Sequence, residues 1–162
     1  MSDQESMNFA APGAHDLVMT RIFDAPRALV FDAWTKAEML RRWLLGPEGW
    51  SMPVCEIDLQ VGGGYRFAWR NDAGNEFGLS GEYREIVPGE KLVATERFEP
   101  AWYPGGATVT TMLTETDGKT VATTTVRYDQ PEARKRALEI NMTKGVAASY
   151  DRMEKMLGRK AA

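Results

Sequence analysis

The chain has 162 residues and a formal net charge of −3, which fits one domain and lacks the excess of Lys and Arg that nucleic-acid-binding domains usually carry. A single cysteine and a single histidine exclude an internal disulfide and a Cys/His metal cluster, and no apolar run approaches the ~18 residues of a membrane span. We therefore expect a cytoplasmic protein without a metal or cofactor, and without a nucleic-acid or membrane partner.

The N-terminal part predicts a disordered tail over residues 1–14, because this stretch is small, polar and aperiodic. A single domain is expected over residues 15–160. Leu17–Phe23 alternates in the manner of a first strand, with Arg21 on the same face as Leu17, Met19 and Phe23.

Two short helices are expected between that strand and Gly46-Pro47. Pro26 stands in the first turn of the first helix, where its missing N–H costs nothing. Thr35 and Glu38 have the spacing of a capping box, which predicts that the second helix begins at once and continues through Trp43. The buried side of the first helix is expected to consist of Leu29, Val30, Ala33 and Trp34.

The residues from Val54 to Tyr128 have the alternation and the turn residues of antiparallel strands. Asp117-Gly118 is a dipeptide preferred in two-residue hairpins, and it predicts that Thr116 pairs with Lys119. The same register pairs Ala107 with Tyr128, Val109 with Val126, Thr111 with Thr124, and Leu113 with Ala122 on the core face. Two interpretations of the threonine pair remain open: the side chains hydrogen-bond to each other, or they line a ligand cavity.

The apolar spacing of Pro131–Leu157 predicts one long amphipathic helix that lies across a face of the sheet. Its apolar stripe consists of Leu138, Met142, Val146, Tyr150, Met153 and Leu157. Gly145 lies inside this predicted helix, where a glycine costs on the order of 1 kcal/mol of helix stability relative to alanine. This indicates either a close approach of helix and sheet or space left for a ligand.

Glu96 alternates onto the same face as Leu92, Ala94 and Phe98, where a carboxylate is costly unless it is paired or hydrogen-bonded. One interpretation is structural: Glu96 lies near the end of its strand or bonds to a Tyr or Thr hydroxyl. The other is functional: a cavity carboxyl with a raised pKa orients a ligand or acts as an acid or base.

Five segments resemble one protein family and together extend from Phe23 to Leu157. They read FDAPRALVFDAWTKAEMLRRWLLGP, EIDLQVGG, GEYREIVPGEKLV, TERFEPAWYPG and GVAASYDRMEKML. The chain resembles a bacterial single-domain member of the START-like (SRPBCC) superfamily, in the branch named after the activator of heat-shock protein 90 ATPase. Gln60 stands where the family pattern Asp-x-Arg-x-Gly-Gly has Arg, so no role that needs this positive charge is expected.

The resemblance implies an α+β helix-grip fold: a curved seven-stranded antiparallel sheet wrapped around a long C-terminal helix, with two short helices after the first strand. It implies structural roles for Trp34, Trp43 and Gly62-Gly63, and a deep, largely apolar cavity between sheet and helix. Superfamily members bind lipids and other hydrophobic ligands or act as polyketide cyclases. A homodimer and a chaperone partner in a stress response are further expectations of this kind.

We therefore expect a small hydrophobic or aromatic molecule to bind between the sheet and the C-terminal helix, without catalysis. The predicted cavity residues are Tyr65, Phe67, Trp69, Tyr83, Glu96, Phe98, Trp102, Thr111, Thr124, Met142, Val146 and Tyr150. The alternatives are a cofactor-independent cyclase or hydrolase that uses Glu96 as its acid or base, and a chaperone-associated stress-response protein that acts through its surface.

Overall fold

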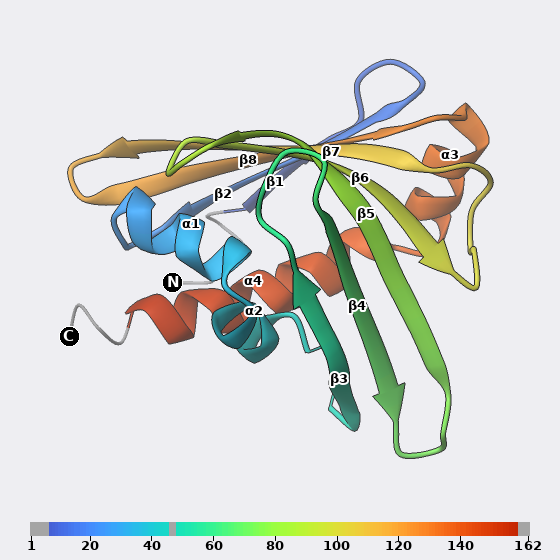
Figure 1. Ribbon diagram of the computed structural model, residues 1–162. Coiled ribbons are helices and arrows are strands. Elements are labelled where there is room, and N and C mark those ends of the chain that lie inside the picture. The colour runs from blue at the N-terminus through green and yellow to red at the C-terminus, as the bar shows by residue number, and fades with distance from the viewer. Residues whose placement is uncertain (1–6, 46–47, 159–162) are drawn as a thin grey trace.

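The computed structural model describes residues 7–45 and 48–158, which form a curved sheet with helices on its concave side (Figure 1). The first half of the chain contains β1 (Met7–Ala10), β2 (Asp16–Phe23), α1 (Arg27–Thr35), α2 (Ala37–Trp43), β3 (Trp50–Ile57) and β4 (Gly64–Asn71). The second half contains β5 (Glu76–Val87), β6 (Lys91–Glu99), β7 (Ala107–Thr116), β8 (Lys119–Tyr128), α3 (Pro131–Glu139) and α4 (Met142–Gly158).

The sheet has eight antiparallel strands in the order β1-β2-β8-β7-β6-β5-β4-β3, so the predicted number of seven is wrong. The additional strand is β1, which pairs with β2 from Met7 opposite Arg21 to Ala10 opposite Val18. The prediction of a disordered tail is therefore wrong for these residues, because four residues are too few for an alternation to be recognised. Residues 1–6 and 159–160, to which the predicted tail and domain also extend, lie outside the described part.

The hairpin between β7 and β8 has the predicted register, and all five predicted residue pairs are confirmed. Asp117 and Gly118 have φ angles of 54° and 77°, as the tight turn between twisted strands requires. The hairpin thereby places Thr111 and Thr124 opposite each other on the buried face.

The sheet curves because two pairs of strands contain irregular pairing. The register shifts between Ser51 and Val54 in β3 and between Tyr83 and Glu85 in β5, and such bulges increase the local twist and bend a strand. Figure 1 shows β3, β4 and β5 turning down past α4, so that the concave side of the sheet faces this helix.

The first two helices follow each other directly, but the predicted capping box is wrong. Thr35 is the last residue of α1, and its buried hydroxyl donates a 2.8 Å hydrogen bond to the carbonyl oxygen of Phe31, one turn earlier. Lys36 is the N-cap of α2 and makes no side-chain capping bond. The predicted buried side of α1 is right for Val30 and Ala33, whereas Leu29 and Trp34 are half-buried. The predicted end at Gly46-Pro47 lies outside the described residues.

The single C-terminal helix that we predicted is divided into α3 and α4. Asn141 separates them with a φ of 57°, a left-handed conformation that asparagine tolerates better than most residues. Leu138 consequently leaves the predicted stripe and is exposed, as is Ile140. The division lets α4 take its own direction beneath the sheet (Figure 1).

The second half of α4 is anchored to the sheet through Arg21 of β2, which is fully buried. Its Nη2 atom lies 2.8 Å from Oδ1 of Asp151 and also contacts the Glu154 carboxylate. Burial lowers the pKa of Arg21, but the two carboxylates outweigh this effect and leave its pKa raised. Arg21 therefore stays charged and holds α4 against β2.

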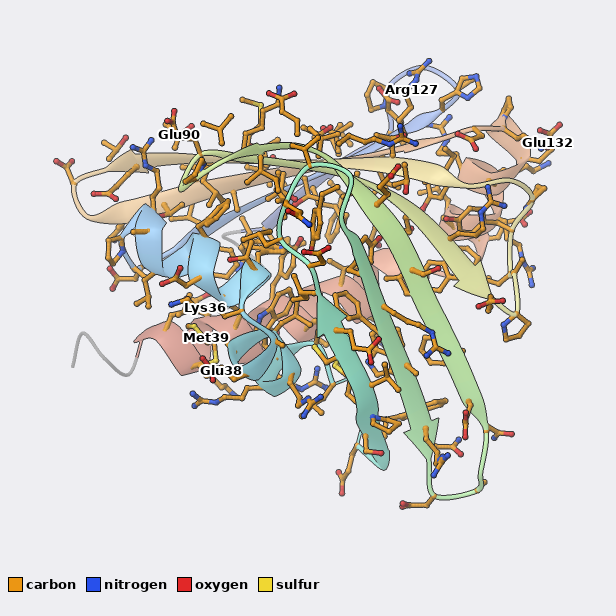
Figure 2. All side chains as sticks on the ribbon, in the orientation of Figure 1. Lys36, Glu38, Met39, Glu90, Arg127 and Glu132 are labelled. Carbon is orange, nitrogen blue, oxygen red and sulfur yellow. The ribbon has the colours of Figure 1, made fainter. Side chains whose placement is uncertain are left out.

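The outer face of the sheet is polar. Figure 2 shows Glu90 and Arg127 on the side of the sheet that faces away from α4, and Arg127 pairs there with Asp16 at 3.0 Å. Apart from the eighth strand and the divided helix, the structure confirms the expected α+β helix-grip fold. In the described part of the chain, no helix is long and apolar enough to span a membrane.

Candidate functional site

A cavity of about 600 Å³ lies between the concave face of the sheet, α2 and α4, and it is partly open to solvent. All of the residues predicted to line a cavity are in its wall. The strand residues of this set meet there because the alternation of each strand places its inward residues on one face. That these residues bind a ligand stays a prediction.

Sequence reasoning missed other parts of the wall. Trp34 and Trp43, to which the resemblance assigns structural roles, also line the cavity, and so do Leu40 of α2 and Arg152 of α4. The signal available for the helices was only their apolar spacing, which does not tell a cavity-lining residue from a core residue. Met19, Phe77 and Leu79 extend the same apolar surface on the sheet.

One wall is a continuous row of aromatic side chains on β4, β5 and β6. The ring centroids of Tyr65 and Phe67 are 5.0 Å apart, and those of Trp69 and Phe77 are stacked at 4.8 Å. The indole nitrogen of Trp69 donates a 2.7 Å hydrogen bond to the carbonyl oxygen of Leu44. With this polar atom satisfied, the row presents mainly apolar ring surface to the cavity.

A second aromatic group connects the helices to the sheet. The Tyr150 ring lies 5.7 Å from the Trp34 ring and 6.0 Å from the Trp43 ring, both measured between centroids. The Tyr150 hydroxyl shares a 3.3 Å hydrogen bond with Thr124, and burial raises its pKa to about 12 although this bond acts in the opposite direction. Thr124 is thus bonded to Tyr150 rather than to its cross-strand neighbour Thr111, and both threonines line the cavity.

Glu96 is the only acidic residue among the described residues that line the cavity. The Tyr103 hydroxyl donates a 3.3 Å hydrogen bond to its Oε1 atom. Burial raises the pKa of Glu96 to about 7, although this hydrogen bond acts to lower it. The structural interpretation of Glu96 is confirmed by its bond to a tyrosine hydroxyl, whereas its role as a ligand contact or as an acid or base stays a prediction.

Glu96 is held in β6 by its pairing with Ala107 of β7, and its neighbour Thr95 makes further contacts. Thr95 uses its carbonyl oxygen to accept a 2.6 Å hydrogen bond from the Tyr65 hydroxyl and its side chain to accept a 2.9 Å bond from the Glu82 amide. A Cβ atom at Gly81 would lie only 1.8 Å from that carbonyl oxygen, so the close approach requires glycine there. Burial raises the pKa of Tyr65, which therefore remains a hydrogen-bond donor.

Glu96 also borders a second, more polar pocket of about 390 Å³ that contains Arg84, Arg97 and Asp129. It thus lies in the wall between the apolar cavity and a polar surface pocket.

Gly145 lies in the part of the wall that α4 forms, together with Met142 and Val146. Apart from its chain neighbours and the nearby backbone of α4, a Cβ atom built on Gly145 would have no described atom within 4 Å. Of the two reasons considered for this glycine, the open space fits the structure and the close approach of helix and sheet does not.

No group of three or more His, Cys, Asp and Glu side chains in the described ranges could hold a metal ion. The residues of the cavity wall offer apolar contact, hydrogen bonding, ion pairing at Arg152 and proton exchange at Glu96.

Comparison with known proteins adds to this description. Residues 24–158 match a protein family described as "Activator of Hsp90 ATPase homolog 1-like protein". Among solved structures, a protein from Rhodobacter sphaeroides is 27% identical, with a TM-score of 0.88 over 94% of this chain and 99% of that chain. A Chromobacterium violaceum protein is 28% identical, with a TM-score of 0.73 over 88% and 96% of the two chains. A Nitrosomonas europaea protein is 25% identical, with a TM-score of 0.80 over 93% of this chain and 99% of that chain. No curated protein matches the chain.

Proposed function

The chain belongs to the Activator of Hsp90 ATPase homolog 1-like family, and we propose that it binds a small hydrophobic or aromatic molecule between its sheet and α4. The observation that carries this proposal is the cavity of about 600 Å³, lined mainly by aromatic and aliphatic side chains. Pockets for small molecules typically have about 300–1,000 Å³, an apolar wall and a few polar groups that fix the orientation of the ligand.

The polar groups of the cavity are few, and apart from those on α4, such as Ser149 and Arg152, they lie mainly on the sheet side. Glu96, Tyr83, Thr111 and Thr124 are spread over β5 to β8. Burial raises the pKa of Tyr83 to about 12, so its hydroxyl stays protonated at neutral pH. We expect the apolar body of a ligand to contact the aromatic row while one polar group bonds to a polar residue of the cavity wall.

Native mass spectrometry of the freshly purified protein tests the proposal directly. A non-covalent adduct that is absent from the denatured mass would support binding and identify the class of ligand. Titration with Nile red, an uncharged dye whose fluorescence increases in an apolar site, extends the test to an empty cavity. The absence of both an adduct and saturable dye binding would refute the proposal.

The variant Gly145→Leu locates the binding site. A leucine here projects into the open space of the cavity wall, and replacing glycine within a helix stabilises it by roughly 0.5–1 kcal/mol. We therefore expect dye affinity to fall by about tenfold or more, equivalent to ~1.4 kcal/mol, without loss of stability. Gly158→Leu is the matched control, since Gly158 is also in α4 with nothing near an added Cβ but lies outside the cavity wall.

A second candidate function is acid–base catalysis by Glu96, and the observation that favours it is the pKa of about 7 inside a cavity. A carboxyl with this pKa can both donate and accept a proton under neutral conditions. For any compound found to bind, Glu96→Gln should then abolish turnover while affinity changes little. Equal loss of affinity and turnover, or no turnover in the unmodified protein, would leave binding as the function.

A further inference from the structure

The described part of the cavity wall contains two charged side chains that form no ion pair with each other. Among the described residues of its wall, Arg152 is the only Lys or Arg and Glu96 the only carboxylate. No ion pair joins the two in the described part of the chain, and the polar contact of Glu96 is with Tyr103. The cavity therefore contains a cation and an acid that do not neutralise each other.

The half-buried Arg152 differs in this respect from Arg21, the fully buried arginine that contacts α4. Arg21 is matched by the carboxylates of Asp151 and Glu154. Arg152 makes no ion pair with a described residue, and its Nη1 atom is buried without a hydrogen-bond partner there. A guanidinium group stays protonated in proteins. The Nη1 atom of Arg152 is therefore a charged hydrogen-bond donor that has no acceptor among the described residues.

The position of Arg152 on α4 directs it to the ligand space. Gly145, Ser149 and Arg152 are spaced i, i+4 and i+7, so they share one face of the helix, and all three line the cavity. Helix side chains lean toward the N-terminus of their helix, which for Arg152 is the direction of Ser149 and Gly145. The open space beside Gly145 lies on this same face.

We propose that the natural ligand is an apolar molecule with one carboxylate group, and that this carboxylate pairs with Arg152 while the apolar body contacts the aromatic row. This inference rests on the proposed binding function and narrows its ligand to organic acids. One guanidinium group supplies one positive charge and a planar pair of donors, which matches a singly charged carboxylate. A phosphate ester with two charges would leave one of them unpaired in an apolar cavity.

The test compares ligands that have the same body and different polar groups. Decanoate, decan-1-ol and decylamine are measured by displacement of Nile red from the unmodified protein, Arg152→Gln, Arg152→Lys and Lys155→Gln. The last variant is the matched control, because Lys155 is an exposed cation of the same helix outside the cavity wall. At about pH 6 decanoate is charged, while Glu96, with its pKa of about 7, is mainly neutral and does not repel it.

The unmodified protein should prefer decanoate to decan-1-ol by about tenfold or more, and decylamine should bind most weakly. Arg152→Gln should reduce decanoate affinity by about tenfold and change decan-1-ol affinity by less than about twofold, whereas Arg152→Lys should retain part of the preference. Unchanged binding of the alcohol also shows that the variant is folded.

Two results would overturn the inference, and they are distinguishable from each other. If the alcohol binds as well as the acid, or if Arg152→Gln weakens both equally, the cavity binds ligands but does not select carboxylates. If neither the dye nor any of the three compounds binds the unmodified protein, the proposed binding function fails and this inference fails with it.

Discussion

Glu96 makes the stability of the protein depend on pH in an unusual direction. Its pKa is raised from 4.5 to about 7 by burial. Between these two values the folded protein keeps a proton that the unfolded chain has lost. The contribution of Glu96 to stability is therefore most favourable below about pH 4.5, decreases as the pH rises, and stays at its lowest value above about pH 7. The stability contribution of a carboxylate in an ion pair has the opposite dependence and is lost as the pH falls.

The size of the effect follows from the shift. A difference of about 2.5 pKa units corresponds to at most roughly 3 kcal/mol, at about 1.4 kcal/mol per unit. The cavity is partly open to solvent, which screens the ionised carboxylate, so we expect about 1–2 kcal/mol between pH 5 and pH 8. Glu96→Gln keeps the shape and the acceptor for Tyr103 but cannot ionise, so this part of the pH dependence should disappear.

Urea unfolding followed by tryptophan fluorescence measures the free energy of unfolding at pH 5, 6, 7 and 8. Glu96→Gln should gain stability relative to the unmodified protein as the pH rises from 5 to about 7, with little further gain between pH 7 and pH 8. Glu56→Gln is the control, because Glu56 is an exposed carboxylate on β3. A stability difference between Glu96→Gln and the unmodified protein that is the same at pH 5 and pH 8 would refute the reasoning.

Three further predictions concern stability, and urea unfolding at neutral pH checks each. The double variant of Asp151→Asn with Glu154→Gln leaves Arg21 buried without a charged partner and should cost about 3–5 kcal/mol. Arg21→Met leaves two carboxylates that reach solvent and should cost less, so the reverse order would contradict this account. Tyr150→Phe removes the hydrogen bond to the β8 threonine and should cost about 1 kcal/mol; no loss would mean that solvent replaces the bond. Gly118→Val forces a β-branched residue to a φ of 77° and should cost on the order of 1–2 kcal/mol, and a neutral effect would show that the turn can change type.

The central hairpin could be predicted in full because its information is local. Asp117-Gly118 determines the turn, the turn determines the register, and the alternation then assigns Thr111 and Thr124 to the concave face. The same reasoning assigned Tyr65 and Glu96 to the concave face of their strands. Period-two patterns thus identify which side chains face the cavity, since every residue of a strand faces one side or the other.

The features that could not be predicted depend on contacts between distant segments. The division at Asn141 leaves the apolar spacing of Pro131–Leu157 almost unchanged, so periodicity alone did not reveal it. The strand at Met7–Ala10 exists because β2 offers an unpaired edge. In the sequence, Arg152 has the spacing of a solvated residue on an amphipathic helix. Only the packing of α4 against the sheet shows that it lines the cavity.

The sequence places Arg21 on the apolar face of its strand, but its ion pairs with α4 were not predicted. A charged residue at an inward position of a strand indicates that a partner of opposite charge packs on the same face. Asp151 and Glu154, spaced i and i+3 on α4, are that partner. This signal could have predicted where α4 crosses the sheet.

The two outermost strands determine how copies of this chain can meet. Within the described residues, β1 contributes four residues to one border of the sheet, and β3, at the other border, contains Pro53 within a break in its pairing. Proline has no N–H to donate, and short or irregular border strands are poor templates for another strand. Continuous sheets that run through two molecules are therefore disfavoured at both borders. Two copies that associate would do so through the outer face of the sheet or through the helices.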